Sequence, residues 1–225
     1  KEWEAAMIYV QKDGDYWKED RRVGQGKRSD LVAGAELIRS KGSIRELYND
    51  DALCSIMAKH GNWAKAVHQF RPIEPYELKL REWQQKVVDR LDEEADDRSI
   101  WWYTDENGGI GKSMLTKYLV ANHDAFLGRG KRTDVLYAYQ NQKIIIFDLV
   151  RADAGQDMPG LYKTMEDLKN GFFLSTKYQA CMKRRVGNAH ILVFANFMPN
   201  RAALSIDRWR ISEWDGEKFV LEGAE

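Results

Sequence analysis

The sequence has little cysteine, no excess of charge of either sign and no long apolar run. Its two cysteines, Cys54 and Cys181, are too few for a disulfide framework and fit a reducing compartment. Lysine plus arginine and aspartate plus glutamate balance at 35 each, so any anion site must be local. No apolar run approaches the roughly 18 residues of a membrane helix, and no signal peptide is visible. Membrane spanning and secretion are therefore not supported.

What is present is an ordinary globular composition. With 225 residues, 44% of them hydrophobic and 31% charged, the chain can build one large or two small domains around a core. No internal repeat and no low-complexity segment is visible. The chain begins KEWEAAMIYV, without an initiator Met, and we interpret it as a fragment or processed piece.

The segment from Ser99 to Val120 predicts a strand, a glycine-containing loop and a helix. Residues 100–104 are typical of a buried strand, and apolar residues recur at helical spacing after Lys112. A strand, a loop ending in Gly-Lys-Ser and a helix form the phosphate-binding loop of P-loop NTPases. Glycines let main-chain N–H groups turn toward an anion, and the helix N-terminus adds partial positive charge. We predict that a nucleotide is held by Asn107, Gly108, Gly109, Ile110, Gly111, Lys112, Ser113 and Met114.

Within this loop, Lys112 is expected to reach the β- and γ-phosphates of ATP, and the Ser113 hydroxyl to bind Mg²⁺. One position departs from the usual pattern, because Glu106 stands where a first glycine is expected. Gly108 and Gly109 are expected to supply the permissive turn instead. Taken alone, the stretch also allows a glycine-rich turn that a lysine happens to follow.

A second strand with a terminal acid follows about 35 residues later. The continuous apolar run of residues 144–147 predicts a strand buried on both faces of a parallel sheet, and Asp148 ends it. We predict that this carboxylate faces the Mg²⁺ of the nucleotide; the alternative is a solvent-facing aspartate at an ordinary strand end. Many ATPases carry a second acid at the next position, where this chain has Leu149. The group that activates water is therefore left open between Asp153 and Glu106.

A third strand, from Ile191 to Phe194, is followed by Asn196, whose amide is suited to hydrogen-bond the γ-phosphate or the attacking water. Arg208 and Arg210 come soon after. An arginine stabilises the charge of a phosphoryl-transfer transition state, either in cis or from a neighbouring subunit. The alternative is that Arg208 pairs with Asp207 at the surface.

The window from Leu168 to Ile206 contains no acidic residue, although it carries six lysines and arginines. Aromatic residues, among them Tyr178, are interleaved with these charges. Such a stretch is typical of contacts to the backbone of single-stranded nucleic acid. The alternative is a solvated basic loop, or one that neutralises the acidic run at residues 92–97. The predicted DNA contacts are Lys177, Lys183, Arg184 and Arg185.

Elsewhere the apolar spacing predicts mostly helices. Helices are expected at residues 1–12, after Ser29, at two or three places between 43 and 70, at 76–91 and at 161–169. Further strands are expected near residues 135–139 and 218–221, and residues 18–30 are interpreted as a charged linker or extended arm.

Four segments follow one another along the chain: ENGGIGKS, IIIFD, a basic segment with STKY, and ILVFAN with DRW after it. In this the chain resembles the superfamily 3 helicase domain of the replication-initiator (Rep) proteins of circular, Rep-encoding single-stranded DNA viruses, such as circoviruses. The resemblance makes these segments motifs A, B, B′ and C, followed by an arginine finger. By position it implies catalytic roles for Lys112, Ser113, Asp148 and Asn196, DNA contact for Lys177 in the central channel, and a finger at Arg208, with Arg210 second.

The first residues resemble another part of the same family. YVQKDG is similar to the third motif of the HUH endonuclease domain, Tyr-x-x-Lys, which is Tyr9 and Lys12 here. The resemblance makes Tyr9 the nucleophile that attacks DNA. GQGKRSDL, residues 24–31, is typical of the segment just after that domain. The metal-binding histidines and carboxylate of the nicking site are absent from this sequence, so this piece is not expected to nick DNA.

The resemblance implies an α/β fold: a three-layer P-loop ATPase domain of the AAA+ type, preceded by a small helical oligomerisation domain. The expected parts are an endonuclease remnant and linker at 1–30, a helical region at 31–92 and the ATPase domain at 93–225. The resemblance also implies ATP and Mg²⁺ as cofactors, single-stranded DNA as a partner, a homo-oligomeric, hexameric ring, and action in the host nucleus. Two other functions stay open from the residues: a monomeric P-loop kinase or phosphotransferase, and a non-catalytic nucleotide-dependent DNA-binding module.

Overall fold

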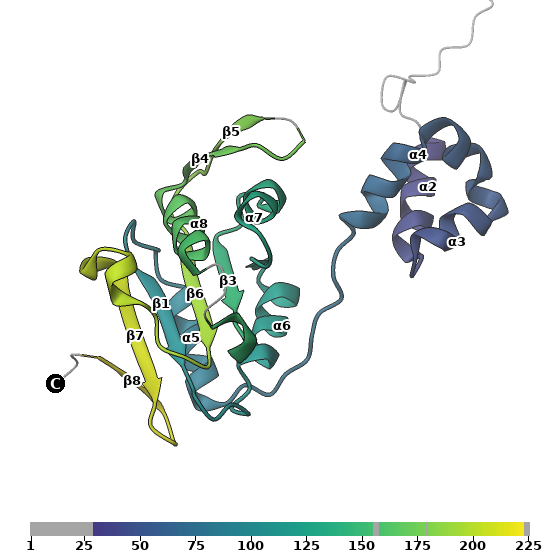
Figure 1. Cartoon of the computed structure of the whole chain (residues 1–225). Helices are drawn as coiled ribbons and strands as arrows, with labels where there is room; N and C mark the ends of the chain where they lie inside the picture. Colours follow the sequence, from purple (N-terminus) through teal and green to yellow (C-terminus); the bar gives the residue numbers. More distant parts are fainter. Residues whose placement is uncertain (1–28, 155–157, 179, 223–225) are drawn as a thin grey trace, which may run out of the picture. The chain divides into compact units, whose positions relative to one another are not determined.

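The computed structural model describes residues 29–154, 158–178 and 180–222 (Figure 1). The predicted endonuclease motif with Tyr9 and Lys12 lies outside these residues. The chain divides into two compact units, one ending at Pro72 and one beginning at Ile73. No described helix is both long and apolar enough to cross a bilayer.

The first unit is helical, as its apolar spacing predicts. It consists of α2 (Ser29–Ser40), α3 (Ile44–Asn49), the short η1 (Asp51–Leu53) and α4 (Cys54–Gln69). Gly34 allows α2 to approach α4 closely, because a Cβ at this position would lie 2.3 Å from the Cδ1 of Ile56. The unit's own small core is formed by Ile38, Leu47, Leu53, Ile56 and Ala64.

The second unit is built on a six-stranded sheet with the order β2-β3-β6-β1-β7-β8. Its first five strands in this order are parallel, and β8 is antiparallel to β7. The strand ends are in register, since Thr104 pairs with Ala195 and Asp148 with Phe194. We call the edge where the parallel strands end the carboxyl edge, and the opposite one the amino edge. The strands are β1 (Ile100–Thr104), β2 (Phe126–Leu127), β3 (Ile144–Asp148), β6 (His190–Ala195), β7 (Trp209–Trp214) and β8 (Phe219–Leu221).

Helices cover both faces of this sheet and make three layers, as predicted. On one face, α5 (Glu82–Leu91) and α6 (Lys112–Asn122) pack over a core that includes Phe194. On the other, α7 (Arg132–Ala138) and α8 (Met158–Asn170) pack over a core that includes Trp102 and Phe147. These three aromatic side chains are fully buried. A strand covered on both faces needs apolar side chains at successive positions, which explains the continuous runs in β3 and β6.

The predicted strand near residues 135–139 is wrong. The segment forms α7 instead, and its buried residues Val135, Leu136 and Tyr139 follow a helical spacing. The apolar run is short enough to fit either structure, and packing against α8 and the sheet decides it. The strand between α6 and α7 is β2, which is only two residues long.

The sequence predicts a boundary near residue 92, and the two compact units divide between Pro72 and Ile73. Helix α5 begins at Glu82, where the main-chain N–H of Arg81 donates to Oε1 of Gln84 at 2.8 Å. Its buried residues Trp83, Val87 and Val88 pack on the sheet, so this helix belongs to the unit that begins at Ile73 rather than to the helical region before it.

A small hairpin, β4 (Phe172–Ser175) with β5 (Cys181–Arg184), separates α8 from β6. It follows the end of α8 and leads to His190, which pairs with Ile144 where β6 and β3 begin. The hairpin therefore lies at the amino edge of the sheet, and Figure 1 shows it beyond that end of the strands. The loop between β1 and α6 lies at the carboxyl edge.

Candidate nucleotide and nucleic-acid sites

The loop of residues 105–111, called the P-loop below, depends on glycine for its shape. Gly108, Gly109 and Gly111 have φ values of +80°, +84° and +95°, a region that side chains disfavour. Because the chain turns at these glycines, helix α6 begins directly at Lys112. The first glycine that Glu106 replaces is therefore compensated by the two at 108 and 109, as predicted.

Helix α5 braces the end of this loop. Nη1 of Arg81 donates to the main-chain oxygen of Ile110 at 2.9 Å, and Nε2 of Gln84 donates to that of Gly111 at 3.0 Å. A Cβ at position 111 would lie 3.0 Å from the same Gln84 nitrogen, so glycine also permits this approach. These contacts keep the two carbonyls occupied and leave the N-terminus of α6 open to an anion.

Lys112 is buried at the base of the P-loop. Its Nζ lies 3.0 Å from Oδ2 of Asp105 and 3.2 Å from the main-chain oxygen of the same residue. The lysine charge is thus balanced by a carboxylate of its own loop. The sequence pattern gave no indication of this partner, since Asp105 falls outside the motif.

Asn196 and Lys112 donate hydrogen bonds to the same atom, the main-chain oxygen of Asp105. The Nδ2 of Asn196 donates to this oxygen at 2.6 Å. The same amide nitrogen lies 3.6 Å from the point where a Cβ on Gly108 would sit. Motifs A and C therefore converge at the carboxyl edge.

Asp148 ends β3 beside Phe194 at this edge. Its side chain is half-buried and, within the described part of the chain, makes no hydrogen bond or ion pair. The next residue, Leu149, is buried and lies where a second acid is often found. Of the two acids left open for activating water, Asp153 accepts the main-chain N–H of Val150 at 2.8 Å, whereas Glu106 is exposed.

The donors at this edge suit Mg²⁺ and a triphosphate. Ser113 is exposed at the start of α6, and Asp148 offers a free carboxylate, which are the oxygen ligands that a hard cation prefers. The described residues hold no group of three or more histidines, cysteines or acids that could form an all-protein metal cage. A metal held by one or two protein oxygens together with phosphates and water is the usual arrangement for Mg²⁺ at phosphate sites.

Sequence reasoning missed one residue at this site, Arg151. It begins the short helix η2 (Arg151–Asp153) after β3, and its guanidinium reaches back to the P-loop. Nη2 donates to the main-chain oxygens of Glu106 at 2.5 Å and Asn107 at 3.0 Å. A contact between residues so far apart in the chain leaves no local pattern.

The hairpin carries the predicted DNA contacts at the opposite edge. Lys177, in its turn, lies 2.6 Å from Asp134, and this hydrogen bond raises the pKa of the lysine. Tyr178 beside it is the most exposed of the hairpin aromatics. Lys183 donates to the main-chain oxygens of Tyr137 and Tyr139, at 2.6 and 2.7 Å, and is therefore partly occupied.

The two arginines that follow differ in exposure. Arg184 is exposed, whereas Arg185 is only 8% exposed and its Nη2 donates to the main-chain oxygen of Lys169 at 2.9 Å. Burial also lowers the pKa of the Arg185 guanidinium. The DNA contact of Arg185 stays a prediction, and the burial of its side chain argues against it.

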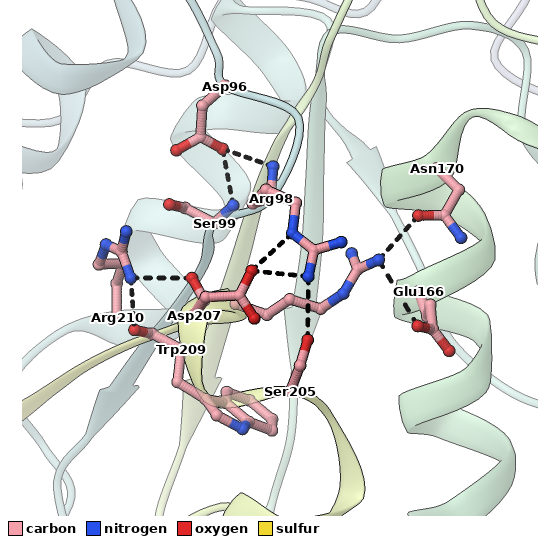
Figure 2. Close-up of polar contacts among 10 residues, drawn as sticks. Asp96, Arg98, Ser99, Glu166, Asn170, Ser205, Asp207, Trp209 and Arg210 are labelled. Atoms are coloured by element: carbon pink, nitrogen blue, oxygen red, sulfur yellow. Dashed lines mark hydrogen bonds and ion pairs between the residues drawn. The ribbon is translucent and has the colours of Figure 1, made fainter.

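The candidate finger Arg210 forms part of a polar cluster with Asp207 and Arg98, which Figure 2 shows. Arg208 is buried, and its Nη2 lies 2.9 Å from Oδ1 of Asn170 and 3.5 Å from Oε1 of Glu166. The suggested pair of Arg208 with Asp207 is not formed. Arg98 takes that place, with Nε 2.7 Å from Oδ2 of Asp207.

Arg210 is half-buried, and its Nη1 donates to the main-chain oxygens of Asp207 and Trp209. The strand register puts both candidate fingers at the amino edge, because Trp209 pairs with Ile100 at the start of β1. Thr104 lies four residues further along, roughly 13 Å at the usual rise of a strand. Neither arginine can therefore touch a phosphate held by the P-loop of its own chain.

Comparison with known proteins agrees with this geometry. Residues 100–197 match the family model described as RNA helicase. The master replication protein of subterranean clover stunt virus (strain F) is 36% identical over 137 residues, which cover 60% of this chain and 46% of that protein. Para-Rep C10 of Milk vetch dwarf C10 alphasatellite is 34% identical over 140 residues, covering 60% and 49%. Para-Rep C2 of Subterranean clover stunt C2 alphasatellite is 39% identical over 135 residues, covering 58% and 46%.

The chain thus spans about half the length of the curated relatives that it matches. The match includes the segment with motifs A, B and C, which the structure brings to one sheet. Over this segment the chain is similar to these replication proteins, which is consistent with its resemblance to the superfamily 3 helicase part of the replication-initiator (Rep) proteins of circular, Rep-encoding single-stranded DNA viruses.

Proposed function

We propose that this chain is the ATP-hydrolysing motor of a viral replication initiator and moves along single-stranded DNA. One observation carries the proposal: Lys112 and Asn196 donate to the same oxygen of Asp105, at the carboxyl edge of the sheet where Asp148 also ends its strand. Ligands of parallel α/β folds bind outside this edge, and the start of a helix after a glycine loop favours phosphate.

Each residue at this edge has a defined task in the proposal. Lys112 exchanges its Asp105 partner for the β- and γ-phosphates, and Asn196 hydrogen-bonds the γ-phosphate or the attacking water. Ser113 and Asp148 hold Mg²⁺, which neutralises the charge that develops on the phosphate oxygens. The glycine loop contributes fixed main-chain N–H donors, so little reorganisation is needed during reaction.

We propose further that the active site is completed in trans within a homo-oligomeric ring, with six subunits as the expected number. The placement of Arg208 and Arg210 at the amino edge supports this, because they are far from the P-loop of their own chain. Arg210 suits the role of finger better than Arg208, since Arg208 is buried and held by Asn170 and Glu166.

The hairpin is proposed to contact the translocating strand. Arg184 is an exposed cation of the hairpin and Lys177 a partly exposed one, and the exposed ring of Tyr178 offers a surface on which a base can stack. The surface pair of Lys177 with Asp134 is solvent-accessible and therefore easily exchanged for a DNA phosphate.

Phosphate release by the purified chain tests the motor. We expect Lys112→Ala to abolish ATP hydrolysis, because the charge on the β- and γ-phosphates loses its fixed counter-ion. Lys117→Ala, an exposed lysine on the same helix, serves as the matched control and should hydrolyse ATP like the wild type. Lys177→Ala should keep basal hydrolysis and lose DNA-stimulated unwinding. Equal hydrolysis by the Lys112 variant would refute the site.

The same assay separates the other functions. Tight ATP binding without phosphate release would favour the non-catalytic module, for which the buried Leu149 in place of a second acid is the supporting observation. A particle that stays monomeric on a sizing column with ATP and single-stranded DNA would favour a phosphotransferase over the ring.

A further inference from the structure

Arg151 lies beside the nucleotide site and has no part in the functions described above. Its Nη2 is 4.0 Å from the point where a Cβ on Gly108 would sit, and Nδ2 of Asn196 is 3.6 Å from the same point. The guanidinium of Arg151 and the amide of Asn196 therefore both lie next to the middle of the P-loop. Asp148, three residues before Arg151, ends β3, the strand that leads to the short helix η2.

The present partners of this guanidinium are weak ones. They are the neutral main-chain oxygens of Glu106 and Asn107, and within the described part of the chain Arg151 forms no ion pair. The residue is exposed, so its charge is not desolvated in the fold. A cation held next to an anion-binding loop by neutral carbonyls is available to a charged ligand.

A phosphate is the ligand that best replaces these carbonyls. The guanidinium presents a planar fork of N–H donors that matches two phosphate oxygens, and hydrogen bonds to a charged acceptor are roughly twice as strong as those to a neutral one. The proposed Mg²⁺ ligands Ser113 and Asp148 occupy the same edge. The terminal phosphate of ATP would therefore lie between a metal and this arginine.

We propose that Arg151 is a cis-acting phosphate-binding residue that distinguishes ATP from ADP; the inference rests on the proposed nucleotide site. With ATP bound, the guanidinium leaves the carbonyls of Glu106 and Asn107 for the γ-phosphate. With ADP bound, the third phosphate is missing and the guanidinium stays on the P-loop. Arg151 then acts from the chain that holds the nucleotide, in contrast to the finger supplied by a neighbour.

Equilibrium binding of fluorescent ATP and ADP analogues in the presence of Mg²⁺ tests this. In Arg151→Ala, the affinity for the ATP analogue should fall about tenfold or more, as expected for the loss of a hydrogen-bonded charge, and the affinity for the ADP analogue should change by less than about twofold. Arg151→Lys, which keeps the charge without the fork, should lie between the variant and the wild type.

Two results with Arg151→Ala would overturn the inference. Equal losses for both nucleotides in Arg151→Ala would make the residue a brace of the P-loop, and unchanged affinities would leave it no role in binding. Arg129→Ala is the matched control, because it removes another exposed arginine near this edge. The same loss of ATP preference in that variant would assign the effect to net charge and likewise overturn the inference.

Lys112→Ala, measured alongside, separates this inference from the function on which it rests. If the Lys112 variant binds both nucleotides like the wild type, the nucleotide site itself is misplaced. If it loses binding while Arg151→Ala retains the wild-type preference for ATP, the site stands and the role of Arg151 is wrong.

Discussion

The amine of Lys112 and the carboxylate of Asp105 form an ion pair at 3.0 Å, and their side chains are only 8% and 1% exposed. Lys112 is the residue on which phosphate binding depends in the proposed function. The protein without nucleotide therefore keeps this cation neutralised by a neighbour in the same loop. In the proposed function, binding of ATP exchanges one anion for another, which would couple the stability of the P-loop to nucleotide.

Asp105→Asn removes the negative charge while keeping the size of the side chain. We expect the free energy of unfolding without nucleotide to fall by about 3 kcal/mol, because a buried lysine is left without its counter-ion. MgATP should then stabilise the variant more than the wild type, since it supplies the missing charge. Urea denaturation with and without MgATP measures both effects. The partly exposed pair of Asp134 and Lys177 provides the control, and Asp134→Asn should lower the free energy of unfolding by less than about 1 kcal/mol. Equal losses in the two variants would contradict the prediction.

The salt dependence of single-stranded DNA binding should show which cations of the hairpin contact DNA phosphates. Each phosphate contact to a single strand contributes a slope of about −0.7 in log affinity against log salt concentration. Lys177→Ala and Arg184→Ala should therefore each make the slope shallower by about 0.7, at unchanged thermal stability.

Arg185→Ala should instead lower the free energy of unfolding by roughly 2 kcal/mol, because it removes a buried hydrogen-bonded side chain. A stable Arg185 variant with a reduced slope would restore that residue as a DNA contact.

Mixing two inactive variants tests whether Arg210 acts in trans. Lys112→Ala subunits would have a defective P-loop and an intact finger, whereas Arg210→Ala subunits would have the reverse. A mixed ring contains interfaces at which both groups are intact, so hydrolysis should reappear on mixing. If mixing Lys112→Ala with Arg210→Ala restores no activity, the trans assignment fails.

Arg208→Ala is expected to lower the free energy of unfolding by about 2 kcal/mol, because Arg208 is buried against Asn170 and Glu166.

The parts of the fold that were predictable are those that leave a local pattern. Strands β1, β3 and β6 are covered on both faces and so appear as continuous apolar runs, and the P-loop glycines mark a turn that side chains disfavour. The segment at 135–139 misled because a short apolar run fits a strand or a helix equally well. Its burial, and not its composition, makes it a helix.

The contacts of the site were less predictable than its motifs. The partner of Lys112 is Asp105, and Arg151 reaches main-chain oxygens more than forty residues away, so neither contact has a sequence signature. The burial of Arg185 and Arg208 runs against the usual exposure of arginine and follows from packing against α8 and its end. Charge patterns therefore indicate a basic window, whose contact with DNA stays a prediction, but they do not show which of its residues are buried.

His190 should make stability depend on pH near neutrality. Its side chain is buried at the start of β6, with Nε2 3.0 Å from the main-chain oxygen of Glu93, and burial lowers its pKa below the usual value of about 6.5, with nearby Lys169 acting in the same direction. Between the two pKa values the unfolded chain binds more protons, so the free energy of unfolding falls as the pH drops below about 6.5, by up to about 1.4 kcal/mol per pH unit. Asp96 and Glu93 lie near the same ring; hydrogen bonds from Ser99 outweigh burial and hold the pKa of the Asp96 carboxyl well below its usual range, so Asp96 titrates below this window. Urea denaturation between pH 7.5 and 5.5 should therefore give a flatter dependence for His190→Asn than for the wild type, while His123→Asn, which removes a half-buried histidine, should follow the wild type. Parallel curves for all three proteins would show that His190 does not carry the effect.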